Sequence, residues 1–184
     1  MNECLLFQTV EDRNNPDEIV SKGPFICTRK DAWLGTGYYF WEQEIFYAEK
    51  WGKNAGYKNY VICESAYNYD DHCFFDLVGN PSHLKTMREF FAILEEEVFK
   101  GENIVITIPM VLDVLRNEMA EDFNFKAIRS KSEWKNWKFT IPFNEKRPNK
   151  EICNLCPEIQ LCVIDKTFLT KEYRIVYPEK YVNQ

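Results

Sequence analysis

Residues 31–51 read DAWLGTGYYFWEQEIFYAEKW, and they are the most informative segment of the sequence. Gly35 and Gly37 precede four consecutive aromatic residues, which predicts a tight turn that leads into a strand over 37–41, because glycine adopts conformations that other residues avoid. Apolar residues then recur at helical spacing over 42–52, which predicts a helix with one apolar face. A tyrosine just after such a turn can stack on a flat heterocycle, although the same pattern also suits a core strand rich in rings.

The other large and charged residues of this stretch have simpler interpretations. Glu42 and Glu44 are expected in the first turn of the helix, where a carboxylate interacts favourably with the helix dipole. Trp33, Trp41 and Trp51 are expected as core rings or as the wall of a cleft.

Outside this stretch, short apolar runs between turn residues predict strands at 4–10, 59–65, 73–77, 125–129, 137–141, 159–164 and 173–176, with a short extended piece at 25–28. Helices are predicted at 17–21, 81–100 and 110–121. Helices that interrupt mostly short strands in a mixed order predict an α+β fold. The length of 184 residues favours a single domain over 1–184.

Composition excludes several classes of protein. A content of 45% hydrophobic and 16% aromatic residues excludes a disordered chain, and a net charge of −6 argues against a general nucleic-acid or membrane-surface binder. No apolar run approaches the roughly 20 residues that span a bilayer, and the first residues do not resemble a signal peptide. Seven scattered cysteines, an odd number, fit a reducing environment, so we expect a cytoplasmic protein with no membrane contact.

Two local patterns leave alternatives open. Cys153 and Cys156 are spaced as zinc ligands, with His72 and Cys73 the only other clustered ligands; we expect unpaired structural thiols and no metal. Lys126–Lys150 holds eight basic and two acidic residues, so this segment carries +6 and the remainder −12. Trp134 and Trp137 stand among these bases, a pattern that suits a phosphate-bearing strand or an acidic partner surface, but also a solvated edge strand.

Gly35-Thr36-Gly37-Tyr38-Tyr39-Phe40, followed by Tyr47-Ala48 in the predicted helix, resembles the central motif of the ADP-ribosyltransferase superfamily. The fuller pattern W-L-G-x-G-x-Y-F-W-E, with A-x-x-W one turn later, is similar to uncharacterised bacterial members. The resemblance implies a split, mostly antiparallel β-sandwich with flanking helices, which binds NAD as a substrate and transfers ADP-ribose to a protein or nucleic-acid acceptor, as a toxin or effector does. In that superfamily the segment before the late strand, here 126–150, often helps to choose the acceptor.

The resemblance also implies roles for individual residues. The catalytic positions are Tyr39, Glu158 and Gln160, and the NAD-binding positions are Gln8, Thr9, Thr28, Gly37, Tyr38 and Tyr47. Gln8 stands where the family has His or Arg, and Gln160 stands at the position of the catalytic Glu. Glu158, two residues earlier on the same strand face, carries the charge that Gln160 lacks.

Three hypotheses therefore stand. The first is an NAD-dependent ADP-ribosyltransferase-like protein. The second is a catalytically inactive module of the same fold that binds a nucleotide or a protein. The third is a nucleic-acid-binding protein that uses 126–150.

Overall fold

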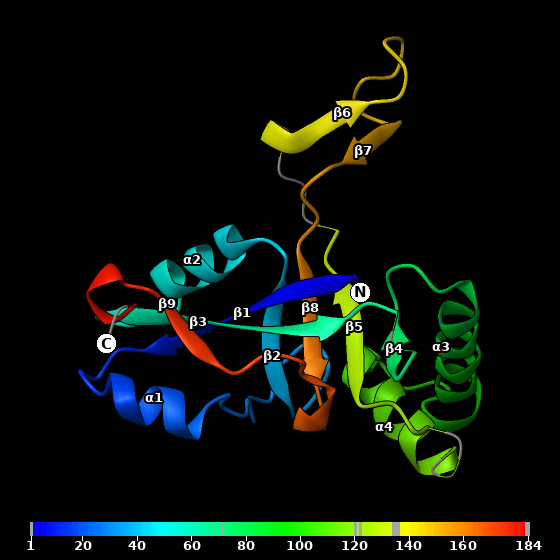
Figure 1. The fold of residues 1–184 in the computed structure, drawn as a ribbon. Coiled ribbons are helices and arrows are strands. Elements are labelled where there is room, and N and C mark those ends of the chain that lie inside the picture. Colours follow the sequence, from blue (N-terminus) through cyan, green and yellow to red (C-terminus); the bar gives the residue numbers. More distant parts are fainter. Residues whose placement is uncertain (1, 71, 120, 122, 134–136, 183–184) are drawn as a thin grey trace.

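The computed structural model describes residues 2–70, 72–119, 121, 123–133 and 137–182. Its strands are β1 (Glu3–Glu11), β2 (Tyr38–Glu42), β3 (Tyr60–Asn68), β4 (Phe74–Asp76), β5 (Ala127–Lys131), β6 (Thr140–Pro142), β7 (Ile152–Asn154), β8 (Ile159–Val163) and β9 (Arg174–Tyr177) (Figure 1). Its α-helices are α1 (Pro16–Lys22), α2 (Ile45–Asn54), α3 (Pro81–Ile93) and α4 (Ile108–Glu118), and a π-helical turn, Leu94–Val98, continues α3. Short 3₁₀ turns lie at Trp137–Phe139, Lys166–Phe168 and Glu179–Tyr181.

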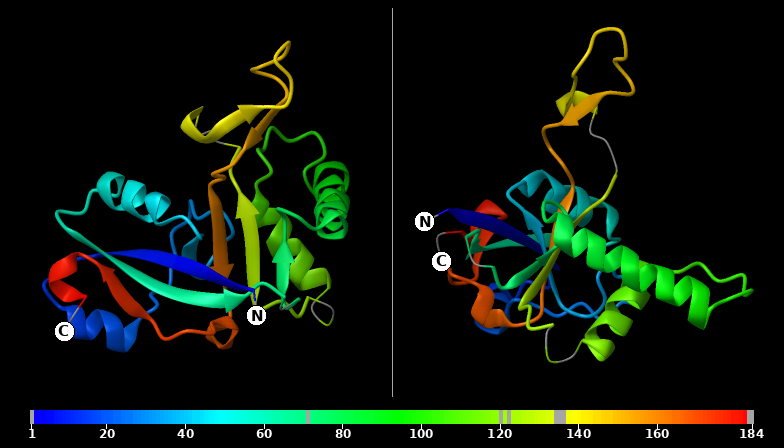
Figure 2. Two further views of the ribbon diagram at one scale, coloured as in Figure 1. Left: turned by 45° about the horizontal axis from the view of Figure 1, so that its top comes forward. Right: turned by 90° about the vertical axis from the view of Figure 1, so that its right-hand side faces the viewer.

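Seven strands form one sheet in the order β4-β5-β8-β2-β1-β3-β9. Only the β4–β5 pair is parallel, and the other neighbours are antiparallel. Strands β6 and β7 pair only with each other, in a hairpin that stands away from the sheet (Figures 1 and 2). The predicted α+β class with a mostly antiparallel sheet is therefore confirmed.

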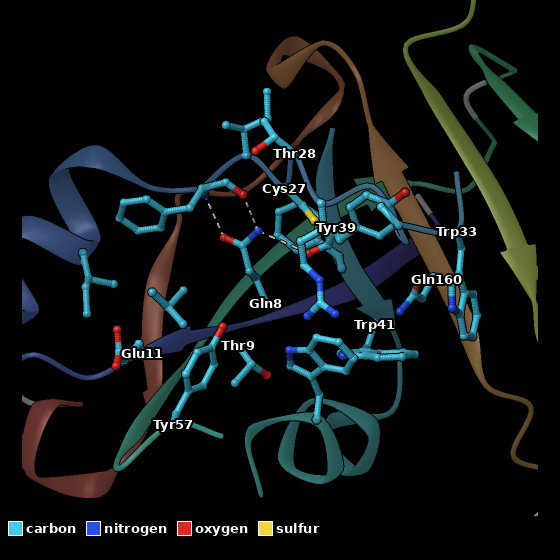
Figure 3. A pocket seen from close by; sticks show the side chains of 18 of the residues that line it. Gln8, Thr9, Glu11, Cys27, Thr28, Trp33, Tyr39, Trp41, Tyr57 and Gln160 are labelled. Carbon is cyan, nitrogen blue, oxygen red and sulfur yellow. Dashed lines mark hydrogen bonds between the residues drawn. The ribbon is translucent and has the colours of Figure 1, made fainter. Parts of the chain in front are cut away.

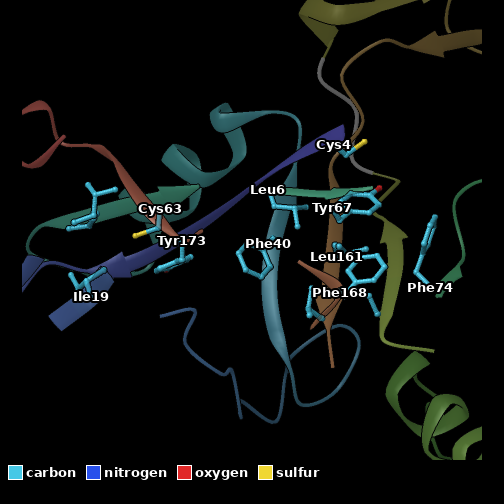
Figure 4. Close-up of a cluster of buried hydrophobic side chains, with 14 residues drawn as sticks. Cys4, Leu6, Ile19, Phe40, Cys63, Tyr67, Phe74, Leu161, Phe168 and Tyr173 are labelled. Atoms are coloured by element: carbon cyan, nitrogen blue, oxygen red, sulfur yellow. The ribbon is translucent and has the colours of Figure 1, made fainter. Parts of the chain in front are cut away.

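Both faces of the sheet are buried, because apolar side chains occupy both alternating positions of its strands. On one face, Leu6, Phe40 and Leu161 belong to a buried cluster that extends along the sheet to Ile19 of α1 (Figure 4). The residues that alternate with them along the strands point to the other face of the sheet and form two clusters. One cluster packs against Tyr47 and Ala48 of α2, and the other packs against Leu112 and Leu115 of α4. The helices thus cover opposite faces of the sheet.

The helix predicted at 81–100 forms, but it is less buried than its pattern suggests. No residue of α3 is buried, and Leu94 in the following π turn is the one buried residue between Pro81 and Val98. Phe91 and Val98 keep 41% and 53% of their surface exposed.

Glu42 does not lie in a helix, and this prediction was wrong. It ends β2 and is only 5% exposed, because Gln43 follows with a φ of 60° and the helix begins at Ile45. Arg129 of β5 donates Nε and Nη2 to the two Glu42 carboxylate oxygens, each at 2.7 Å. The nearby Asp76 carboxylate accepts from Arg129 Nη1 at 3.2 Å, so Glu42 belongs to a buried network with Arg129 and Asp76 and not to the first turn of a helix.

Candidate functional site

The sheet opens between β1 and β2. Strand β1 pairs with β3 along all nine of its residues, whereas β1 and β2 pair only at Leu6–Glu42 and Phe7–Trp41. Beyond Phe7 the two strands diverge, and the opening is the candidate site.

The Gln8 side chain closes the point at which β1 and β2 diverge. Its Nε2 donates to Phe25 O at 2.9 Å and to Tyr39 O at 3.2 Å, and its Oε1 accepts from Phe25 N at 2.9 Å and from the Tyr173 hydroxyl at 2.8 Å (Figure 3). A glutamine amide has two donors and two acceptor positions, so all four are occupied by the protein. Gln8, which was expected to hold the dinucleotide, therefore joins β1 to neighbouring segments of the chain. Its amide has no free donor or acceptor for a ligand.

A cavity of about 890 Å³ fills the opening. This volume lies within the range of roughly 300–1,000 Å³ that is usual for small-molecule sites. Gln8, Thr9, Thr28, Tyr39 and Gln160, five of the nine expected site residues, line it. The turn, the first strand and the late strand therefore meet at one place, although they are far apart in the sequence.

Aromatic side chains form one end of the cavity. Trp33 meets Trp41 edge to face with ring centroids 6.2 Å apart, and Trp51 lies 6.4 Å from Trp41 (Figure 3). Trp33 and Trp51 are each 37% exposed, whereas Trp41 is 7% exposed. These rings form the cleft wall that was one of the two expectations for them, and they offer flat surfaces to a ligand.

Gln160 lies at the same end, opposite Trp41 in the β2–β8 register, and close to Trp33 in Figure 3. It is 8% exposed and lines the cavity. Within the described part of the chain, its amide makes no hydrogen bond with another residue. The amide atoms are not among the fully enclosed side-chain atoms of the described residues, so they reach the cavity, where water or a ligand can bind them.

Tyr39 is held in place by its hydroxyl group. The hydroxyl accepts from Leu34 N and donates to Gly35 O, both at 2.7 Å, and so closes the turn in which Gly35 has a φ of +80°. Burial raises the pKa of Tyr39 well above its ordinary value, so the hydroxyl stays protonated as this donor. The hydroxyl is thus structural, while the ring lines the cavity.

Charged residues lie along the remaining wall in pairs. Arg29 donates Nε and Nη2 to the Asp31 carboxylate at 2.9 and 2.7 Å, and its guanidinium carbon lies 5.5 Å from the centre of the Trp51 ring. The hydrogen bonds between Arg29 and Asp31 raise the pKa of Arg29 and lower the pKa of Asp31. Arg13 pairs with Glu11 in the same way at 2.7 Å.

Three expected site residues lie outside the cavity wall and have packing roles. A Cβ on Gly37 would lie 2.3 Å from Cys162 Sγ, so glycine is needed for close packing against β8. Tyr38 lies on the opposite sheet face, with Lys166 Nζ 4.7 Å from its ring centre. Tyr47 is buried below α2, where its hydroxyl donates to Cys156 O at 2.5 Å.

Glu158 also lies outside the cavity wall. Its carboxylate accepts from Ser132 Oγ at 2.5 Å and is 3.2 Å from Lys50 Nζ, and the residue is 8% exposed. The carboxylate nearest in sequence to Gln160 is therefore held by two other side chains.

The remaining predicted features do not form a second site. Within the described residues, no three His, Cys, Asp or Glu side chains come together as a metal cluster, and Cys153 and Cys156 are free thiols. Over the same residues, no helix has the length and apolar character needed to cross a membrane.

The basic segment Lys126–Lys150 does not form one exposed surface, because Arg129 is buried. Trp134 and the side chain of Trp137 lie outside the described structure.

Sequence reasoning missed Arg13, Asn15, Arg29 and Tyr57 on the cavity wall. They are isolated polar or aromatic residues in loops, and nothing in their spacing indicates a site. Comparisons with protein-family models, with curated proteins and with solved structures found no match to this chain. Its function is therefore inferred from the cavity itself.

Proposed function

We propose that this chain is an ADP-ribosyltransferase-like protein that binds NAD in the cavity between β1 and β2, and that binding, rather than transfer, is its main activity. The observation that carries the proposal is the Gln160 amide, which lines the cavity beside the tryptophan rings and makes no hydrogen bond to another side chain or backbone group of the described residues. A primary amide offers a donor and an acceptor side by side, which matches the carboxamide of nicotinamide. The neighbouring rings supply flat faces for the pyridine ring of that group.

The rest of the dinucleotide has room in the same cavity. Arg13 and Arg29 are 76% and 56% exposed at their side chains, and each is paired with an exposed carboxylate. Exposed ion pairs contribute little to stability, so both cations can exchange their carboxylate for a phosphate. Thr9 Oγ1 donates to Ala48 O and keeps an acceptor position for a ribose hydroxyl.

Binding without transfer is favoured by the charges near Gln160. Cleavage of the nicotinamide–ribose bond builds positive charge on the ribose, which a nearby carboxylate stabilises. Gln160 is neutral, and the Glu158 carboxylate is held by Lys50 and Ser132 outside the cavity wall. The diverging β1 and β2, and the motif tyrosine on the cavity wall, support the superfamily assignment itself.

Transfer of ADP-ribose to a macromolecular acceptor is the second candidate function. The observation in its favour is that Glu158 immediately precedes β8 and is two residues from Gln160. Transfer would require the Glu158 carboxylate to leave Lys50 and Ser132 and to face the ribose. Nicotinamide release that is lost in Glu158→Gln would establish this second function.

Titration calorimetry with NAD tests the first proposal. We expect Gln160→Leu to weaken NAD binding about tenfold, because one hydrogen bond of about 1–1.5 kcal/mol is lost and a factor of ten corresponds to about 1.4 kcal/mol. Gln43→Leu is the matched control, since Gln43 is exposed and away from the cavity wall, and it should bind as the unchanged protein does. Absence of heat with NAD at millimolar concentration, or equal affinity of Gln160→Leu and the unchanged protein, would contradict the proposal.

A further inference from the structure

The β6–β7 hairpin is a projection that the cavity does not use. We call residues 138–155 the arm; all residues from 141 to 150 are exposed. Figures 1 and 2 show the arm standing away from the seven-stranded sheet in every view. An isolated two-stranded hairpin is only marginally stable in water, so an arm of this kind gains stability from a surface on which it docks.

Apolar side chains project from the arm. Phe143 is 75% exposed, Leu155 57% and Ile141 54%. Phe139 is exposed as well, at 41%. Scattered exposed apolar residues are ordinary on a protein surface, but here four lie on one small projection, which is typical of an interaction site.

The arm is also basic. Its four basic residues, Lys138, Lys146, Arg147 and Lys150, outnumber Glu145 and Glu151 by two. Arg147 pairs with Glu151 at 2.7 Å, whereas Lys146 and Lys150 make no ion pair within the described part of the chain. A docking surface for the arm should therefore be apolar and acidic.

A surface of that composition lies elsewhere on the same molecule. We call residues 91–108 the shoulder: the end of α3, the π turn and the chain that leads into α4. Phe91, Val98, Ile104 and Val105 are exposed there, Val105 at 83%. Glu95, Glu96, Glu97 and Glu102 are exposed among them, and the segment contains only one base, Lys100.

The arm and the shoulder of one molecule point in different directions. The right-hand view of Figure 2 shows the arm rising from the sheet while α3 and the chain after it extend sideways. One molecule therefore cannot cover its own shoulder with its own arm. We propose that the arm of one copy docks on the shoulder of a second copy, apolar residues against apolar residues and lysines against glutamates.

Two features favour a protein over a nucleic acid as the occupant. Two of the four exposed apolar residues of the arm, Ile141 and Leu155, are aliphatic, so they do not stack on bases as the two phenylalanines could. The arm also contains two carboxylates, and its net charge of only +2 neutralises few phosphates. The association is independent of NAD binding, because the arm contributes no residue to the cavity wall.

Sedimentation and light scattering on the full chain test the proposal. We expect self-association at about 100 μM that weakens with added salt, because salt screens exposed charges over about 10 Å at 0.1 M. Ile141→Ser with Phe143→Ser should raise the dissociation constant at least tenfold. Unchanged thermal unfolding and unchanged NAD calorimetry are the controls for this double variant, and they separate this proposal from the function proposed above.

A charge exchange gives the sharpest test. The arm variant Lys146→Glu/Lys150→Glu and the shoulder variant Glu95→Lys/Glu96→Lys should each be monomeric alone, because like charges then face one another. Mixed in equal amounts, they should associate, because each arm again meets a shoulder of opposite charge. A monomer at low salt, association that no arm or shoulder variant changes, or a monomer whose arm binds an oligonucleotide would overturn the proposal.

Discussion

Replacing Gln8 with leucine tests whether this side chain joins the two halves of the sheet. Leucine has nearly the same size, but it removes both the donors and the acceptor of the amide. Phe25 N, Phe25 O, Tyr39 O and the Tyr173 hydroxyl then lose one partner each. Because Gln8 is 6% exposed, water replaces those partners poorly.

The expected loss follows from these four hydrogen bonds. A neutral hydrogen bond contributes a net of about 1 kcal/mol, so four of them give about 4 kcal/mol, less a few tenths for the more apolar side chain. This is a large share of the 5–15 kcal/mol by which a domain of ordinary stability is folded. Tyr173→Phe removes one of the four bonds and should cost about 1 kcal/mol.

Urea unfolding followed by tryptophan fluorescence measures these losses. With a slope of about 2 kcal/mol per M, Gln8→Leu should lower the midpoint by roughly 2 M with the slope unchanged, and Tyr173→Phe by roughly 0.5 M. Gln43→Leu, the same substitution at an exposed residue, should leave the midpoint where it is. A Gln8→Leu protein that unfolds at the original midpoint would refute the role given to this amide.

Two further substitutions test charged or titratable groups, one buried and one half-buried. Arg129→Met leaves Glu42 and Asp76 as buried carboxylates without their cation. In the same urea assay, it should lower the free energy of unfolding by about 3–5 kcal/mol, and a loss below about 1 kcal/mol would contradict the ion network. The Nδ1 atom of His83 accepts a hydrogen bond from Asp76 N, and partial burial lowers the pKa of the ring. The neutral ring therefore contributes its full share to the stability of the fold above about pH 6.5, the pKa in the unfolded chain. This contribution is lost as the pH falls through the lower pKa of the folded state. The free energy of unfolding of His83→Gln should therefore depend less on pH between about 7 and 5 than that of the exposed control His72→Gln, and equal slopes would argue against a neutral, half-buried His83 ring.

Much of the sheet could be predicted because its strands are buried on both faces. Continuous apolar runs such as those of β1 and β8 give a strong signal, and both strands lie within one residue of their predicted bounds. Strand β7 was missed because three residues with exposed neighbours do not form an apolar run. The predicted strand at 137–141 is instead a 3₁₀ turn followed by β6, since the hairpin has no core to straighten it.

The candidate site was predictable only in part. The glycine turn placed Tyr39 correctly, because its pattern is local. The roles of Gln8 and Glu42 depend on partners 17 to 165 residues away, and no local pattern indicates such partners. Glu42 shows the limit most clearly, because an acidic residue near the start of a helical pattern suggests a place in the first helical turn unless Arg129 is known to face it.

The place of β2 in the sheet has a consequence for synthesis of the chain. One edge of β2 pairs with β1, which is made first, but the other edge pairs with β8, which is made about 120 residues later. Until Ile159–Val163 has left the ribosome, the aromatic strand β2 has an unpaired edge, and edges of this kind invite pairing with other chains. The nascent protein therefore depends on the synthesis of β8, or on a chaperone, to protect the strand that carries Tyr39 and Trp41.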